Sequence, residues 1–274
     1  MKYENEKNNV IIEAGNINIG DAVQFGKNIQ VKVKGEFTID SFSKIGDNSN
    51  ILGNNIIIGK HFYNSSNLRI GGGGHLHPNA NFKIGDRCTL HNNFINVCEK
   101  VELGNDVGLS HNVSIITHGY WLSVLEGYPA DFSSVKLCNG VIAGYRSIIL
   151  MGVTVGNNAV LGAHSVVTNN LKGHCIYGGN PAKLIKKIIP LDNESKLLKI
   201  EHILNEYKKI YKYRGINPFI EFNYPIVTVN ECFFDVEKLT FEGVENEETD
   251  DFRDYVRKWG LRYYSTRPFK SVVE

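Results

Sequence analysis

Hydrophobic residues between Leu137 and Lys187 recur at every sixth position. The apolar residues of the repeat are Ala143, Ile149, Val155, Leu161 and Val167, and the small or β-branched residues four positions later are Ser147, Val153, Ala159 and Ser165. A period of six matches neither an α-helix, which repeats every 3.6 residues, nor a lone strand, which alternates every two. It predicts short strands wound into coils, which stack so that neighbouring coils bury each other's apolar side chains.

Positions within one repeat are expected to have different roles. The apolar residue points inward, and the small residue four positions later fills the corner between two strands. A glycine directly follows three of the apolar residues, as Gly144, Gly156 and Gly162. Because glycine has no Cβ, we expect these glycines to allow a tight bend of the chain.

The same period continues towards the N-terminus with shifts in register. Residues at a spacing of six are Val33, Ile39, Ile45, Ile51 and Ile57. The pair Ile58–Gly59 then shifts the pattern by one residue, and the repeat resumes at Ile84 and runs to Ile115. Met1 to Asn9 is polar and charged, so we expect a loose lead-in before a β-helix domain that spans residues 10–189.

Four consecutive glycines, Gly71 to Gly74, make the first interruption of the repeat. Such a run forms either an irregular edge of a coil or a place where the backbone approaches a ligand. In an extended strand, the following His75 and His77 would lie on the same side. Both histidines are therefore candidate substrate contacts.

A second interruption covers residues 118–136, where no stretch fits the repeat. A long structureless segment in a compact domain is typical of a lid or a binding loop. Its aromatic residues, among them Tyr120 and Trp121, suit stacking against a sugar face. We therefore predict that Tyr120 and Trp121 bind the substrate.

Residues 190–274 lack the repeat and are predicted to form a small α+β extension. From Leu191 to Tyr213, apolar residues recur at spacings of three and four between charged residues, which is typical of an amphipathic α-helix. Asp192 or Asn193 is the candidate N-cap, and Gly215 marks the end of this helix.

The remainder of the extension is expected to contain two or three short strands and a second helix. The predicted strands lie within residues 219–243 and include Pro225–Val229 and Glu237–Phe241, and the predicted helix is Thr249–Trp259. The extension is either a small appendage or an element that packs against a neighbouring subunit. The sequence leaves both roles open.

Overall composition narrows the classes of function. The 274 residues carry a formal net charge of +1, which argues against general binding of nucleic acid or of anionic membranes. The sequence has no run of about 18 apolar residues and no apolar leader, so we expect no membrane insertion and no secretion. Five cysteines without a C-x-x-C pair favour a reducing compartment, and we expect a cytoplasmic protein.

Two motifs give the repeat a family resemblance. The stretch Asn112–His118 reads NVSIITH, and the stretch Gly178–Lys186 reads GGNPAKLIK. Together with the repeat they resemble the hexapeptide-repeat acetyltransferases, and most of all the branch that O-acetylates sugars. This resemblance implies a left-handed parallel β-helix, acetyl-CoA as the acetyl donor without a metal, and a homotrimer. It also implies a carbohydrate acceptor, such as a capsule or lipopolysaccharide unit or its precursor.

The resemblance also assigns roles to individual residues. It makes His118 the general base of a direct transfer, and a neutral imidazole suits this task because its pKa lies near the working pH. It places the backbone amide that stabilises the developing oxyanion at Gly144 and Tyr145. The implied coenzyme A contacts are Ala163, Thr168, Lys183 and Lys186. At the last two positions relatives often have Arg, and Lys neutralises phosphate only as a point charge.

Three alternatives remain beside this interpretation. An N-acetyltransferase acting on an amino-sugar nucleotide needs the same base, so His118 does not discriminate against it. A zinc hydratase of the γ-carbonic anhydrase type needs three converging histidines, two of them about five residues apart in relatives, whereas His111 and His118 are seven apart. A non-enzymatic β-helix scaffold would leave His118 and the closing motif unexplained. Surface or structural roles are expected for His61, His91, His111, His164, His174 and His202.

Overall fold

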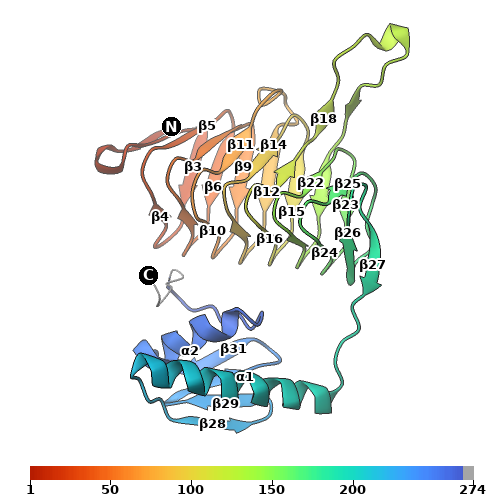
Figure 1. The fold of residues 1–274 in the computed structure, drawn as a ribbon. Helices are drawn as coiled ribbons and strands as arrows, with labels where there is room; N and C mark the ends of the chain where they lie inside the picture. The colour runs from red at the N-terminus through yellow and green to blue at the C-terminus, as the bar shows by residue number, and fades with distance from the viewer. Residues whose placement is uncertain (268–274) are drawn as a thin grey trace. The chain divides into compact units, whose positions relative to one another are not determined.

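Residues 1–267 are described by the computed structural model (Figure 1), and residues 268–274 of the predicted extension lie outside the described residues. The chain divides into a first unit, Met1–Ile189, and a second unit that begins at Pro190. The first unit is a left-handed parallel β-helix. Each coil crosses three sheets in the order A, B and C, and equivalent strands of successive coils pair in parallel.

The three sheets within residues 1–267 have the following strands. Sheet A contains β1 (Lys2–Asn5), β2 (Val10–Glu13), β5 (Ile29–Val33), β8 (Asn50–Gly53), β11 (Arg69–Gly71), β14 (Phe94–Asn96), β17 (Ser114–Ile115), β22 (Ile148–Ile149) and β25 (Val166–Val167). Sheet B contains β3 (Asn16–Ile19), β6 (Glu36–Ile39), β9 (Asn55–Ile58), β12 (Asn81–Ile84), β15 (Val101–Leu103), β20 (Val135–Leu137) and β23 (Thr154–Val155). Sheet C contains β4 (Gln24–Phe25), β7 (Lys44–Ile45), β10 (Tyr63–Asn64), β13 (Thr89–Leu90), β16 (Gly108–Leu109), β21 (Ile142–Ala143), β24 (Val160–Leu161), β26 (Cys175–Gly178) and β27 (Lys183–Lys187).

Burial confirms the inward positions of the predicted repeat. The five apolar residues of the repeat between Ala143 and Val167 are each at most 1% exposed. The four small or β-branched corner residues, between Ser147 and Ser165, are equally buried. Corner hydroxyls also bond the backbone: Ser147 Oγ donates to the carbonyl oxygens of Gly144 and Gly162 at 2.8 and 3.0 Å. The corners are therefore filled by groups that also satisfy buried carbonyls.

The glycines of the repeat are needed for a different reason than predicted. Gly144 and Gly156 lie outside the left-handed region, and the positive φ of the turn falls two residues later, as at Arg146 with a φ of 57°. A Cβ at Gly144 would lie 2.7 Å from the carbonyl oxygen of Leu161, in the next coil. At Gly144 and Gly156 glycine is required because backbone of the following coil approaches closely, so the prediction based on freedom to bend is wrong. At Gly162 the nearest atom to a Cβ would lie at 3.4 Å, which is ordinary contact distance.

Sheet B confirms the one-residue shift in register and locates it. Ile56 and Ile58 of β9 are both fully buried, whereas Ile57 between them is partly exposed. The inward position therefore moves from Ile51 to Ile58, a step of seven residues. Ile57 keeps the spacing of six in the sequence but does not point into the core.

The N-terminal residues form a hairpin, so the prediction of a loose lead-in is wrong. Strand β1 pairs antiparallel with β2 and extends sheet A beyond the first coil. The turn between them contains a 3-10 helix, η1 (Glu6–Asn8), and Asn9 with a φ of 52°. The ring centroids of Tyr3 and Phe25 lie 5.8 Å apart. These contacts order a polar segment at the open end of the stack.

The interruption at residues 118–136 forms an arm that projects from the stack of coils (Figure 1). Its base is an antiparallel pair, β18 (His118–Gly119) with β19 (Asp131–Phe132), and it also contains a 3-10 helix, η2 (Val124–Glu126). The prediction of a structureless segment is therefore wrong. Val135 is already buried in β20, so the arm ends before the predicted boundary.

The second unit combines two helices with a four-stranded antiparallel sheet, within the part of the chain that is described. Helix α1 (Asn193–Arg214) starts at the N-cap Asp192, one of the two predicted caps, and ends at Gly215. The strands are β28 (Ile220–Asn223), β29 (Ile226–Val229), β30 (Cys232–Asp235) and β31 (Thr240–Gly243). Helix α2 (Glu247–Arg257) begins two residues before its predicted start. The predicted strand Glu237–Phe241 is mostly a turn, because only Thr240 and Phe241 pair with β30.

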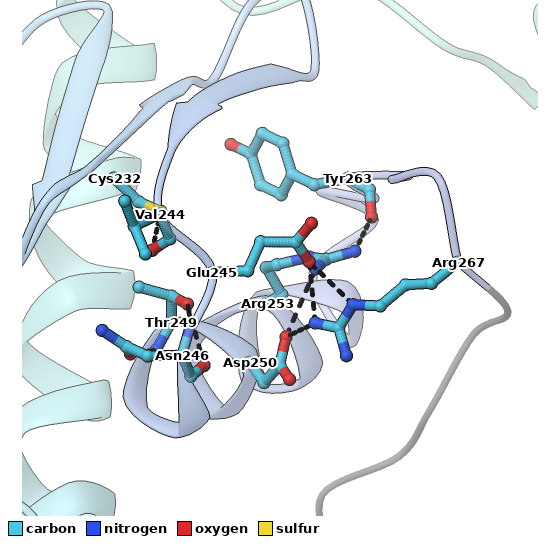
Figure 2. A network of polar contacts seen from close by, with 9 residues as sticks. All are labelled: Cys232, Val244, Glu245, Asn246, Thr249, Asp250, Arg253, Tyr263 and Arg267. Atoms are coloured by element: carbon cyan, nitrogen blue, oxygen red, sulfur yellow. Dashed lines mark hydrogen bonds and ion pairs between the residues drawn. The ribbon is translucent and has the colours of Figure 1, made fainter.

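Charged side chains bind α2 to the segments on either side of it (Figure 2). Arg253 donates from Nη1 to Glu245 Oε2 at 2.5 Å and from Nη2 to the carbonyl oxygen of Tyr263 at 3.0 Å. Arg267 donates to the same Glu245 oxygen from Nε and Nη2, at 2.9 and 2.7 Å, and also pairs with Asp250. Beneath this network lies a separate core, rich in aromatic residues, that includes Tyr207, Phe234 and Phe252.

A matched pair of substitutions tests the register of β9. Ile58→Ala should lower the free energy of unfolding by about 2–5 kcal/mol, because it opens a cavity in the core. Ile57→Ala removes the same atoms from the outer face and should cost less than about 1 kcal/mol. Denaturant titration followed by circular dichroism measures both. Equal losses in the two variants would contradict this register.

Candidate active site

Two edges of the β-helix carry most of the predicted site residues. The A–B edge consists of the turns that lead from sheet A to sheet B, and it contains His118, the arm and the glycine run Gly71–Gly74. The C–A edge consists of the turns from sheet C to sheet A, and it contains Gly144, Tyr145 and Ala163.

At the A–B edge, Asn96 fixes the orientation of His118. The Asn96 amide nitrogen donates to the carbonyl oxygens of Gly71 and Gly73, at 3.2 and 3.0 Å. Its oxygen accepts from the Thr117 hydroxyl and lies 2.9 Å from His118 Nδ1. Asn96 is only 2% exposed. A buried amide with every position bonded holds its partners firmly.

This network also determines the tautomer of His118. Two carbonyl oxygens face the Asn96 nitrogen, so the Asn96 oxygen must face the imidazole. An oxygen acceptor requires Nδ1 to carry the proton. Nε2 of neutral His118 is then left with its lone pair, and this is the state that a general base needs.

The glycine run lies directly against this imidazole. A Cβ at Gly73 would lie 3.5 Å from His118 Nε2, which is ordinary contact distance. A Cβ at Gly74 would lie 2.3 Å from Cys98 Sγ, and Gly74 has a φ of 81°. Glycine at position 74 is therefore required by space and by conformation. The glycine run is thus an irregular turn at the edge of the coil that packs against the imidazole.

The two predicted histidine contacts do not lie on a strand. The segment after Gly72 is a series of turns, with backbone bonds from His75 to Gly72 and from His77 to Gly74. His75 Nδ1 lies 2.8 Å from the Gly72 carbonyl oxygen. His77 Nδ1 lies 3.9 Å from a Glu99 carboxylate oxygen. The premise of an extended strand is wrong, although both residues lie in the A–B turn that also holds Gly73.

The aromatic residues of the arm divide into two groups. Tyr120 and Phe132 lie close to His118, with ring centroids 5.6 and 5.9 Å from the imidazole, and they stack on each other at 5.3 Å. Trp121 is 90% exposed. Tyr120 therefore borders the imidazole directly, whereas Trp121 extends into solvent from the same arm.

At the C–A edge, only one of the two residues assigned to the oxyanion amide, Tyr145, has a backbone donor that is not already bonded within residues 1–267. The amide of Gly144 already donates to the carbonyl oxygen of Leu161 at 2.9 Å, so it is not available for an oxyanion. Among the described residues, neither the Tyr145 nor the Ala163 amide has a recorded hydrogen bond. Lys183 pairs with Gly178 at the start of β27, close to this edge, and Lys186 lies further along the same strand.

A single chain does not bring the two edges together. The chain crosses sheet A in the five steps from Tyr145 to Leu150, and at about 3.3 Å per step they separate the edges by about 16 Å. Thr168 is on the same edge as His118, because β17, β22 and β25 stack in register. Of the predicted cofactor contacts, Thr168 alone therefore shares an edge with the predicted base.

Sequence reasoning missed Asn96. The sequence does contain a signal for this residue, because a polar side chain stands between two apolar residues, Ile95 and Val97, that are both buried. An unpaired polar residue at such a position is costly, so a partner had to exist. The partner, His118, lies more than twenty residues away and is brought close only by the stacking of one coil on the next.

Within residues 1–267, no cluster of three or more His, Cys, Asp or Glu side chains could hold a metal ion. None of the helices in the described part has the length and apolarity to cross a bilayer.

Comparison with known proteins identifies the family, although no family model matches the chain. Protein CapG of Staphylococcus aureus is 41% identical over 133 residues, which cover 45% of this chain and 73% of CapG. The galactoside O-acetyltransferase of Escherichia coli K12 is 26% identical over 158 residues, covering 54% of this chain and 66% of that enzyme. The chain belongs to the hexapeptide-repeat acetyltransferases. As a member of this family it is an acyltransferase that uses acetyl-CoA.

Among solved structures, a galactoside acetyltransferase in complex with coenzyme A is similar over 64% of this chain and 66% of that one. It is 19% identical, with a TM-score of 0.36.

Substitution of Asn96 tests its control of the imidazole. In Asn96→Ala, His118 should lose its preference for the proton on Nδ1, which ¹⁵N NMR of the imidazole detects. Because the base is then misplaced, kcat should fall by about 10- to 100-fold. Asn93→Ala is the control, because Asn93 is equally buried but donates to the carbonyl oxygen of Ser110. An unchanged tautomer in Asn96→Ala would contradict this role.

Proposed function

We propose that this acetyltransferase moves acetyl from acetyl-CoA directly to a hydroxyl group of a carbohydrate, with His118 as the general base. The observation that carries the proposal is the imidazole held through Nδ1 by Asn96, with Nε2 unprotonated at the edge of the β-helix. The galactoside acetyltransferase named among its relatives supports a sugar acceptor. A capsule or lipopolysaccharide unit, or its precursor, fits the long aromatic arm beside the base.

The chemical step follows from this geometry. The acceptor hydroxyl donates its hydrogen bond to His118 Nε2, and its oxygen attacks the thioester carbon while the proton moves to Nε2. The tetrahedral intermediate then expels the coenzyme A thiolate, which takes the proton back from the imidazolium. The Asn96 oxygen stabilises the transient imidazolium through the Nδ1–H bond. No acyl-enzyme is formed.

A trimer brings together the A–B and C–A edges, which lie apart in a single chain. Reacting groups must approach within about 3–3.5 Å, yet the two edges of one chain are about 16 Å apart. We propose that the A–B edge of one subunit faces the C–A edge of the next, as closed threefold symmetry allows. The Tyr145 amide then stabilises the oxyanion, and Ala163, Thr168, Lys183 and Lys186 hold coenzyme A.

Removal of the base is the direct test of the proposal. His118→Ala should lower kcat by about 10²- to 10⁴-fold, because no group remains to take the hydroxyl proton. The Kd for acetyl-CoA, measured by calorimetry, should stay within about threefold. His202→Ala, on α1 of the second unit, should leave turnover unchanged. Full activity of His118→Ala would place the base elsewhere.

The same assay, run with a panel of acceptors, decides the acceptor class. The panel contains neutral sugars, oligosaccharides and amino-sugar nucleotides. Ester products that are cleaved by hydroxylamine support O-acetylation. Products that are resistant to it and formed only with amino sugars would identify an N-acetyltransferase instead.

Lys183 tests the cofactor site. Because its ammonium is proposed to neutralise a coenzyme A phosphate, Lys183→Ala should raise the KM for acetyl-CoA about 3- to 10-fold with little change in kcat. Lys136, exposed on β20 of sheet B, provides the control as Lys136→Ala. A KM equal to that of the unaltered enzyme would remove Lys183 from the site.

A further inference from the structure

A hollow of about 400 Å³ lies in the second unit, where the C-terminal ends of α1 and α2 meet. Its lining includes four basic side chains, Arg214, Arg257, Lys258 and Arg262, and one carboxylate, Asp254. The volume is within the range of pockets that hold small ligands. It is far larger than the space needed for a single water molecule.

Two of the four basic groups have carboxylate partners. Arg214 pairs with Asp251, which is 2% exposed. Arg257 lies 3.9 Å from the Asp254 carboxylate. These two side chains thus complete structural contacts as well as lining the hollow.

The other two basic groups, Lys258 and Arg262, form no ion pair with a carboxylate among residues 1–267. The Lys258 ammonium lies over the ring of Tyr255, 4.0 Å from its centroid. Arg262 is partly buried and makes no ion pair with the residues described here. The C-terminal ends of two helices offset part of this charge, each by roughly half an elementary charge. The hollow therefore retains a net positive charge.

Tyr255 contributes its ring to the lining of the hollow. Its side chain lines the hollow and is 6% exposed, yet its hydroxyl has no hydrogen-bond partner within the described part of the chain. A buried hydroxyl without a partner costs about 1–3 kcal/mol. The hydroxyl is closed to solvent, so a ligand in the hollow would contact the Tyr255 ring and not this oxygen.

We propose that this hollow binds a small phosphorylated molecule, of the size of a sugar phosphate or a mononucleotide. Guanidinium groups bind phosphate oxygens through paired, charge-assisted hydrogen bonds. Ile210 and the Tyr255 ring supply an apolar wall for the remainder of the ligand. All residues of the site belong to the second unit, and none of them is among those assigned to acetyl transfer.

Isothermal titration calorimetry of the full chain at low salt tests the proposal. The probes are pyrophosphate, glucose 1-phosphate, UMP and, as the neutral control, glucose. The phosphorylated probes should bind with a Kd below about 1 mM, and glucose should not bind. Raising the salt concentration should weaken binding, because the interaction is largely electrostatic.

Three variants locate the site. Arg262→Gln should raise the Kd about tenfold, because it removes one charged contact to phosphate. Lys199→Gln, on α1 away from the hollow, and Lys183→Gln, in the proposed coenzyme A site, should leave it unchanged. If Arg262→Gln fails to fold by circular dichroism, Lys258→Gln takes its place with the same expected result.

Several results of these titrations would contradict the proposed phosphate site. An absence of binding by every phosphorylated probe at 10 mM, roughly tenfold above the expected Kd, would overturn the proposal. So would binding that Lys183→Gln abolishes and Arg262→Gln leaves intact, since the anion would then occupy the cofactor site. Equal weakening by all three variants would show only a general attraction of anions. Acetyl transfer in Arg262→Gln should remain normal in every case.

Discussion

The close stacking of one coil on the next is the constraint on which the rest of this structure depends. Successive backbones approach so closely that a Cβ at Gly144 would touch the carbonyl of the following coil. In-register stacking aligns equivalent turns along two edges, and those edges then carry the candidate chemistry. His118 owes its position to this alignment, because the Asn96 that orients it belongs to the preceding coil. Residues more than twenty positions apart thus become neighbours without any long loop between them.

The repeat was readable from the sequence because each of its positions has a single physical role. An inward side chain in a narrow three-sided core must be apolar or small, so the spacing of Ala143, Ile149 and Val155 could be recognised without a structure. The role of the glycines was not readable in the same way. These glycines are needed because the backbone of another coil lies close to them, and the spacing of residues within one coil does not predict that contact.

The missed features share a dependence on contacts between distant segments. Met1–Asn9 looked too polar to be ordered, yet pairing with β2 gives its backbone donors and acceptors partners at the end of sheet A. Asn96 was missed, because its role depends on the carbonyls of Gly71 and Gly73, which lie in the preceding coil. His118 was recognised from its flanking motif, whereas the network that sets its tautomer could not be. Local patterns predicted the elements, and long-range hydrogen bonds determined the site.

Both insertions interrupt the β-helix at the same edge, and the stacking explains why the fold tolerates them. Strand β15 pairs with β20 across the whole arm, with Leu103 opposite Leu137, so the ladder continues as if the arm were absent. The turn after Gly71 likewise leaves β12 paired with β9 and β15. The entropic cost of a longer surface loop rises only slowly with its length, and the core loses no contact. The A–B edge can therefore change in length and composition around a fixed imidazole.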